Sequence, residues 1–506
     1  MLKWLSLLNF QGDIWIDALC INQEDSVERS YQVALMAKLY KQANNVLVGL
    51  EPPGNGLHAL PGCWTTASNI MQGLLAGKHL DQLDLLNKIV PQNTIVSSLT
   101  LSSGLHEIQN LIASTWFTRA WTVQEACLAR KMTFICEGGT ISWDDMSDMF
   151  IQYQTHRTRC CAHVVNTLQA DLRSWLYQIY SHLEGINYTR RALARGQHIS
   201  RSLLHYQAMS ATDPRDKFFA FRGLHTMSTE QDLPAPDYSK SKEETFTELA
   251  IWLMRDQQSL SVLCIHLPDV DKRCPSWVPD WSVRSADTID PSYQRMRLDF
   301  LDMYNAAKGL RMDFDHLSST KLRLCGAFFD HVDLVAERSF ELDSIENNIE
   351  VLESWYRLGY PDVRGPIIAF NDDFALIMLA GCIAQPGQCV REAAPDDVFA
   401  WKTQVRRMLS EPSAFHHPVM TSHTAAVLKR RLFRTRKGYI GVGPAGMGKE
   451  SEIWLLGGGT APFVLQRSTA SVGDVPECRL IGHCYVHGVM KGEGVDVSAV
   501  QHCVLT

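Results

Sequence analysis

The sequence lacks an apolar run of the roughly 20 residues that a helix needs to cross a lipid bilayer. The longest candidate, residues 374–384, is shorter and follows two aspartates, which predicts a buried helix. The start also lacks the features of a signal peptide, because its weak apolar stretch continues directly into residues predicted to form core structure. We therefore predict no membrane span and a cytoplasmic location.

The sequence has no excess of basic residues, and its cysteines show no C-x-x-C spacing. The 506 residues carry a formal net charge of −7, whereas general nucleic-acid binders usually carry a basic excess. The 14 cysteines are scattered and form no C-x-x-C pair, which indicates reduced thiols rather than a disulfide scaffold. The prediction is a protein of a reducing compartment that does not bind nucleic acid.

Common catalytic and binding motifs are missing as well. There is no G-x-S-x-G elbow and no H-E-x-x-H motif, so a serine hydrolase or metalloprotease has no support. Residues 443–450 nearly fit a P-loop, but Glu450 replaces the Ser or Thr that would hold magnesium, and a strand is expected next. The sequence assigns no certain cofactor. We predict no metal site, because four candidate ligands would face opposite sides of a strand: Cys478, His483, Cys484 and His487.

The best-patterned stretch lies near the start of the chain. Residues 14–19 form a short apolar run that predicts a strand, and residues 20–25 form a polar turn. Asp25 and Glu28 have the spacing of a capping box, and Val33, Met36 and Tyr40 share one face of the helix that follows. Residues 46–48 predict a second buried strand. The pattern predicts a βαβ unit with two parallel strands.

This stretch resembles the central motif of fungal heterokaryon-incompatibility (HET) domains. The resemblance extends from Trp15 to Gln23 and continues through Glu28 and Arg29 to Met36 and Tyr40. A second block, residues 116–125, resembles the family's R-x-W-x-x-Q-E block. The strand motif with which the family pattern normally begins is absent, so we expect an N-terminally shortened domain. The resemblance assigns these residues to the motif and its pocket: Trp15, Cys20, Asn22, Gln23, Asp25, Arg29, Arg119, Trp121 and Gln124.

Glu125 is the candidate acid of the second block. On a helix it shares a face with Trp121 and Leu128, so its carboxyl group must be paired, hydrogen-bonded or protonated. One interpretation is structural: Glu125 forms an ion pair with Arg119 or Arg29, or caps a loop. The other interpretation is that Glu125 is a functional acid.

HET domains in turn resemble TIR domains, which have a parallel-sheet α/β fold. Some TIR domains cleave NAD at the nicotinamide–ribose bond with a glutamate four residues after a tryptophan, the spacing of Trp121 and Glu125 here. Nicotinamide leaves as a neutral group, so one carboxylate that stabilises an oxocarbenium-like state can suffice. The resemblance implies Glu125 as catalytic residue, Asp17 as a second polar group, and NAD as a possible substrate. Asp17 could equally be a turn or cap residue.

The later regions resemble segments that follow HET domains in the same family. They are the A-T-D-P-R-D-K block at 211–217, residues 236–238 and 275–281, and the glycine-rich tail. Trp277 and Trp281 predict a packing plug, and the basic residues 429–437 predict an edge strand. The predicted regions are a shortened TIR-like α/β domain (1–150), a mainly helical region (151–300), a mixed helical region (301–425) and a small antiparallel β-rich region (426–506).

The HET resemblance implies a role in fungal non-self recognition and programmed cell death, exerted through self-association or an incompatibility partner. Two alternatives stay open. The first is an NAD glycohydrolase that uses Glu125, and the second is an accessory or tailoring protein of a biosynthetic gene cluster. Composition and spacing alone indicate only an α/β protein.

Overall fold

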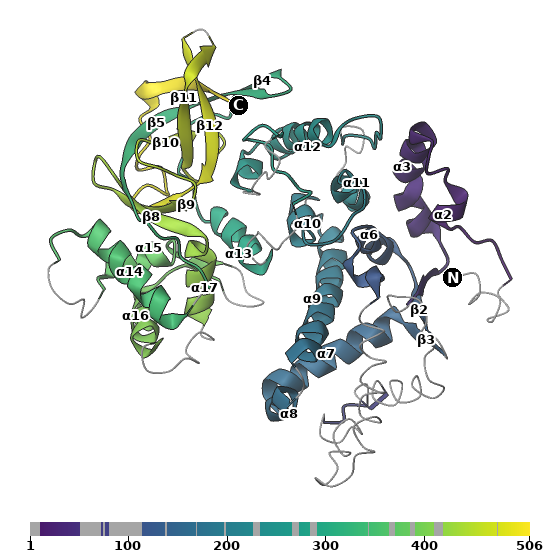
Figure 1. Ribbon diagram of the computed structural model, residues 1–506. Coiled ribbons are helices and arrows are strands. Elements are labelled where there is room, and N and C mark those ends of the chain that lie inside the picture. Colours follow the sequence, from purple (N-terminus) through teal and green to yellow (C-terminus); the bar gives the residue numbers. More distant parts are fainter. Residues whose placement is uncertain are drawn as a thin grey trace. The chain divides into compact units, whose positions relative to one another are not determined.

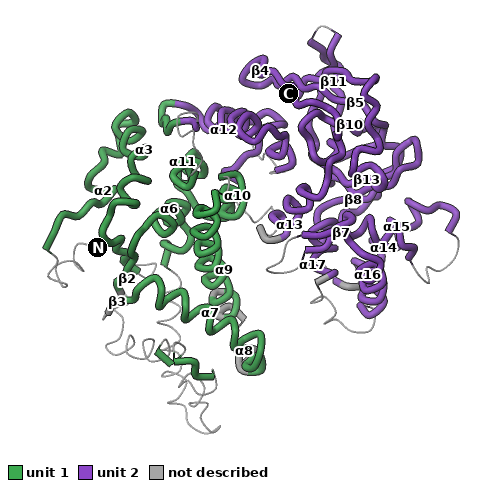
Figure 2. The backbone as a smooth tube through the Cα atoms, turned by 180° about the vertical axis from the view of Figure 1, so that it is seen from behind, with its two compact units in different colours: residues 1–231, 235–239 green, residues 232–234, 240–506 purple. Residues whose placement is uncertain are grey.

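The computed structural model forms two compact units (Figures 1 and 2). Unit 1 contains residues 1–231 and 235–239, and unit 2 contains residues 232–234 and 240–506. The structure describes residues 11–50, 72–73, 76–79, 114–136, 139–167, 170–196, 199–225, 233–265, 273–283, 291–342, 344–363, 370–384, 390–408, 418–472 and 474–506.

The sheet of unit 1 is small. Strand β1 (Val46–Gly49) pairs in parallel with β2 (Met132–Cys136), and β2 pairs antiparallel with β3 (Gly139–Ser142). The parallel pair agrees with an α/β fold, but the more specific prediction of a TIR-like parallel sheet is not confirmed.

The predicted strand at residues 14–19 is wrong. Residues 17–20 instead form a single helical turn, α2 (Asp17–Cys20). The N–H groups of Leu19 and Cys20 donate to the carbonyl of Ile16, and the side chain of Asp17 accepts from the N–H of Ala18. These local bonds satisfy groups that a strand would have to pair with a neighbour. The predicted βαβ unit is therefore wrong too, and the parallel partner of β1 comes from residues 132–136 instead.

The predicted helix after the polar turn is confirmed as α3 (Ser26–Gln42). Asp25 caps it by accepting from the N–H groups of Val27 and Glu28. The carboxylate of Glu28 accepts from the N–H of Asn22 rather than closing the capping box on Asp25. Helix α3 thus starts with the polar turn held against its first residues.

Helix α6 (Trp121–Leu128) lies among several helices of unit 1. It packs against α3, α9 (Ala170–Leu193) and α11 (Asp216–Arg222), and it follows the short helix η2 (Thr115–Thr118). Phe134 of β2 is fully buried beneath Trp116, Phe117 and Trp143. The other helices described in unit 1 are α7 (Trp143–Arg159), α8 (Ala162–Thr167) and α10 (Ile199–His205).

Unit 2 begins with helices and continues into mixed structure. The helices are α12 (Lys242–Gln257), η3 (Ser261–Cys264), α13 (Pro291–Leu301), α14 (Ile345–Gly359), α15 (Asp372–Met378), α16 (Pro395–Met408), α17 (Pro418–Val427) and η6 (Val497–Ala499). The strands are β4 (Phe314–Ser318), β5 (Lys321–Val335), β6 (Cys382–Ile383), β7 (Arg391–Glu392), β8 (Arg430–Thr435), β9 (Ile440–Pro444), β10 (Glu452–Leu456), β11 (Phe463–Val472), β12 (Val475–His483), β13 (Tyr485–Val486) and β14 (Val500–Leu505).

Five of these strands close into a ring. Long strand β5 pairs with β10 on one edge and β14 on the other, while β10 pairs with β11, β11 with β12, and β12 with β14. The pairings are antiparallel except for β12 with β14. Phe329, Val332, Ile453, Leu455 and Val464 belong to the buried core of this barrel. The prediction of a small, mainly antiparallel β region at the C-terminal end is confirmed.

The basic strand β8 is not an edge strand, contrary to prediction. It pairs with β5 on one side and β9 on the other, and the buried guanidinium of Arg430 contacts His483 and the carbonyl of Val442. A buried charged side chain is tolerated when such hydrogen-bond partners offset its loss of contact with water. The predicted packing plug is confirmed, because Trp277 and Trp281 are each only 1% exposed.

Two further predictions for unit 2 are confirmed. Strand β10, not a helix, follows residues 443–450. The apolar stretch at 374–384 begins with the short buried helix α15. Within the described ranges, no helix is both long enough and apolar enough to span a bilayer.

Candidate functional site

Glu125 of α6 is partly shielded from water and accepts hydrogen bonds from neutral donors. The indole Nε1 of Trp116 donates to Oε2 of Glu125 at 3.2 Å, and the hydroxyl of Tyr40 also hydrogen-bonds the carboxyl group. Burial raises the pKa of Glu125, and these hydrogen bonds only partly oppose the rise. The carboxyl group is therefore easier to protonate than one in water.

Two charged residues of the predicted site lie near Glu125. Asp17 raises the pKa of Glu125, whereas Arg119 lowers it. Trp15 packs its ring edge-on against Tyr40, with the centroids 6.2 Å apart. Tyr40 and Trp116 were not among the predicted site residues, although both lie in the motifs named above. We call this group the Glu125 cluster: Trp15, Asp17, Tyr40, Trp116, Arg119 and Glu125.

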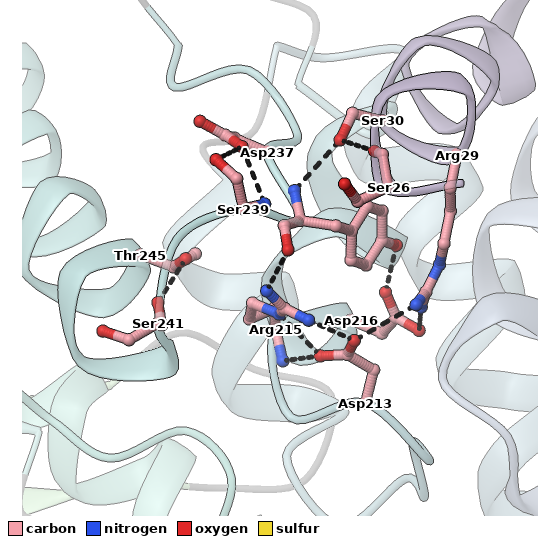
Figure 3. Close-up of polar contacts among 11 residues, drawn as sticks. Ser26, Arg29, Ser30, Asp213, Arg215, Asp216, Asp237, Ser239, Ser241 and Thr245 are labelled. Carbon is pink, nitrogen blue, oxygen red and sulfur yellow. Dashed lines mark hydrogen bonds and ion pairs between the residues drawn. The ribbon is translucent and has the colours of Figure 1, made fainter. Parts of the chain in front are cut away.

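Arg29 does not pair with Glu125, so that part of the structural prediction is wrong. Its guanidinium lies 3.3 Å from Asp213 and 3.5 Å from Asp216, and it stacks 3.6 Å from the centre of the Tyr238 ring (Figure 3). Asp213 and Asp216 are 13% and 8% exposed, so the cation neutralises carboxylates that are largely shielded from water.

A second arginine completes this arrangement. Arg215 contacts both oxygens of Asp213, at 2.9 and 2.8 Å, and donates to the carbonyl of Tyr238. Burial alone would raise the pKa of Asp213, but the hydrogen bonds and charge of Arg215 lower it. Burial raises the pKa of Asp216, although Tyr238 and Trp121 donate hydrogen bonds to its carboxylate. We call these residues the Arg29 cluster: Arg29, Trp121, Asp213, Arg215, Asp216 and Tyr238.

Gln124 also has a structural role. Its side chain is buried, and its Oε1 accepts from the N–H of Gly223 at 3.1 Å, at the end of α11. A Cβ atom added at Gly223 would lie 2.4 Å from that oxygen and 2.5 Å from the Cβ of Ala37. The close approach of α3, α6 and the end of α11 therefore requires glycine at this position.

The remaining predicted residues lie in the exposed turn between α2 and α3. Cys20, Asn22, Gln23 and Asp25 are all exposed. The side-chain oxygen of Asn22 accepts from the N–H of Glu24, and the amide of Gln23 donates to the carbonyl of Asp17. The motif thus divides into residues that hold unit 1 together and polar residues that face solvent.

Comparisons with known proteins identify the class. The model of the heterokaryon incompatibility protein (HET) family matches residues 2–125, and the model of the Het-6 β-barrel domain matches residues 388–502. The chain therefore resembles heterokaryon-incompatibility proteins in these two segments. A curated relative is "Heterokaryon incompatibility protein 6, OR allele" of Neurospora crassa, which is 23% identical over 594 residues that cover 96% of this chain and 82% of the relative. No solved structure matches.

The structure explains why the A-T-D-P-R-D-K block accompanies the HET motifs in this chain. The HET match ends at residue 125, but unit 1 continues through residues 235–239. Arg29 and Trp121 from the matched region hold Asp216 from the later block. The block is thus part of the same compact unit. The block could be recognised in the sequence, but the residues that it contacts could not.

Proposed function

We propose that this protein acts in the cytoplasm of a fungus as a non-self recognition factor whose activation leads to programmed cell death. The observation that carries the proposal is the pair of family matches, HET and Het-6 β-barrel, in one chain. The relative that aligns with 96% of the chain is itself named an incompatibility protein.

The exposed turn of the motif is the proposed contact surface for a partner or for a second copy of the chain. Asn22 and Gln23 are exposed, and their side chains hydrogen-bond the backbone N–H of Glu24 and the carbonyl of Asp17, respectively. In contrast, Arg29, Trp121 and Gln124 stabilise the unit from inside. Exposed polar side chains in a loop on a rigid scaffold are suited to recognition.

Expression in a filamentous fungus tests the proposal. Cell death after hyphal fusion would be scored with a vital dye for the parent, for the double variant Asn22→Ala/Gln23→Ala, and for Lys41→Ala. Lys41 is an exposed residue at the end of α3 and serves as the matched control. We expect the double variant to lose killing and the control to keep it, at equal protein levels. Absence of killing by the parent in compatible and incompatible fusions alike would refute the role.

NAD cleavage by Glu125 is a second candidate function. It is favoured by the convergence of Glu125, Asp17 and Tyr40, because a desolvated carboxyl group with a raised pKa is a common catalytic feature. Glu125 would have to lose its proton to oppose the positive charge that develops on the ribose.

Nicotinamide release from NAD tests this activity directly. The purified chain would be compared with Glu125→Gln and with Glu184→Gln, which changes a partly exposed carboxylate on α9. Release by the parent and the control, but not by Glu125→Gln, would support an NAD glycohydrolase. No release at high protein concentration would exclude it, and killing that survives Glu125→Gln would assign cell death to assembly.

A further inference from the structure

Four metal-ligand side chains meet at the junction of α7 and α8, and none of them belongs to either cluster described above. They are His79, His156, Cys160 and Cys161, and their candidate ligand atoms all lie within 4.8 Å of one another. We propose that these residues form a zinc site. The proposal differs from the sequence-based prediction, which placed no metal site in the chain.

The end of α7 places three of the ligands. His156 and Cys160 are four residues apart and so share one face of the helix. The N–H groups of Cys160 and Cys161 both donate to the carbonyl of His156, at 3.1 and 2.7 Å, which turns two successive thiols toward the imidazole. The negative end of the helix dipole also lies here, which favours a cation.

Four of the six distances between the ligand atoms are close to the edges of a tetrahedron around one ion. Nδ1 of His156 lies 3.2 Å from Sγ of Cys160 and 3.8 Å from Sγ of Cys161, which lies 3.5 Å from Nδ1 of His79. The two sulfur atoms are 3.6 Å apart. A tetrahedron with zinc–sulfur bonds of about 2.3 Å and zinc–nitrogen bonds of about 2.05 Å has edges of about 3.8 Å between sulfurs and about 3.5 Å between sulfur and nitrogen.

The chemistry of the ligand set favours zinc. Two thiols and two imidazoles make a Cys₂His₂ set, and a tetrahedral set of two sulfurs and two nitrogens is typical of zinc. The sulfur atoms of Cys160 and Cys161 are too far apart for a disulfide with each other, whose length is roughly 2.05 Å. Four protein ligands leave no open position, so the ion would be structural.

The site also has a route for the ion and a structural consequence. His156 and Cys161 are buried, while His79 and Cys160 are exposed, so an ion can reach the buried pair from solvent. Binding would join residues 76–79 to the α7–α8 junction across 82 positions of sequence. An ion that binds only this folded arrangement stabilises it in proportion to its affinity.

Metal binding by the full chain under reducing conditions tests the proposal. We expect one Zn²⁺ per chain and, with Co²⁺ as a probe, the visible absorption of tetrahedral cobalt together with thiolate charge-transfer bands. The variants His79→Asn and Cys160→Ser change the two exposed ligands and so spare the core. Each should weaken zinc binding at least about tenfold, because even changes to residues behind a metal ligand cost about 10- to 100-fold.

Matched controls separate this site from incidental binding. His163→Asn and Cys20→Ser change an exposed histidine on α8 and an exposed cysteine in the motif turn, and both should bind metal as the parent does. Zinc should also raise the melting temperature of the parent and of both controls more than that of either ligand variant. Substoichiometric zinc in the parent, or equal metal affinity in ligand variants and controls, would overturn the proposal.

Discussion

The Arg29 cluster tests whether burial or distance decides how much an ion pair contributes to the stability of this protein. Arg29→Ala removes a cation that lies 3.3 Å from Asp213, 3.5 Å from Asp216 and 3.6 Å from the ring of Tyr238. The control Arg191→Ala removes a cation only 2.8 Å from Glu184, but there the side chains are 57% and 37% exposed. The shorter contact should matter less, because solvent screens it.

The magnitude follows from the exposure of the partners. At an effective dielectric constant of about 20, each Arg29 contact has a gross Coulomb energy of about 5 kcal/mol, much of it offset by desolvation. The side chain of Arg29 is itself 22% exposed, and Asp216 can take up a proton because burial already raises its pKa. The stability lost in Arg29→Ala is therefore smaller than the gross Coulomb energy. With about 1 kcal/mol for the stacked ring, we expect Arg29→Ala to cost about 3 kcal/mol and Arg191→Ala less than about 0.5 kcal/mol.

Native-state hydrogen exchange in increasing urea measures both effects on the full chain. Peptides from α3 report the opening of the region around Arg29, and peptides from α9 report on Arg191. The opening free energy of α3 should fall by about 3 kcal/mol in Arg29→Ala. Equal losses in the two variants, or a larger loss in Arg191→Ala, would falsify the argument from burial.

The other predictions concern single side chains in both units. Because burial raises the pKa of Glu125, the folded state holds that proton more tightly than the unfolded state, so stability should fall as pH rises from about 4.5 through the folded-state pKa. Glu125→Gln should remove this pH dependence in urea titrations, and an unchanged profile would show that another group causes it. Gly223→Ala should destabilise unit 1 by about 1–3 kcal/mol, whereas Gly448→Ala, where nothing lies within 4 Å of the added Cβ, should be nearly neutral by thermal unfolding. Glu452→Ala should destabilise unit 2 by about 3 kcal/mol, because it leaves the indole of Trp454 without its buried acceptor and removes the partner of Arg467. The exposed Glu450→Ala should cause no measurable change in the same denaturant titration, and a similar loss in both variants would contradict the argument.

Local signals in the sequence predicted local structure well. Asp25 is a helix cap because its side chain can reach the N–H groups two and three residues later, and this geometry needs no knowledge of the rest of the chain. The packing of Trp277 and Trp281 was similarly predictable, because large aromatic groups close to prolines have few alternatives to burial.

Predictions that depended on distant partners failed or were incomplete. An apolar run at 14–19 fits a strand, but a strand needs a neighbour, and the partner that β1 uses lies at residues 132–136. Arg29 was one of two arginines considered as a partner of Glu125, yet its carboxylate partners are Asp213 and Asp216, which lie far away in the sequence. The His79 and Cys161 pair was missed for the same reason, since no spacing rule connects positions so far apart.

The ring of unit 2 affects the order in which the protein can fold during synthesis. Strand β5 emerges from the ribosome long before β14, yet β14 fills the gap between β5 and β12. Until Leu505 has emerged, one edge of β5 and one edge of β12 present unpaired backbone groups, which invite pairing with other chains. Unit 1 has all its segments once residue 239 is available. A nascent chain that stops between residue 239 and the end of β14 would therefore carry a complete unit 1 and an open, aggregation-prone unit 2. Such a chain is a substrate for chaperones until the last strand of the ring has been synthesised.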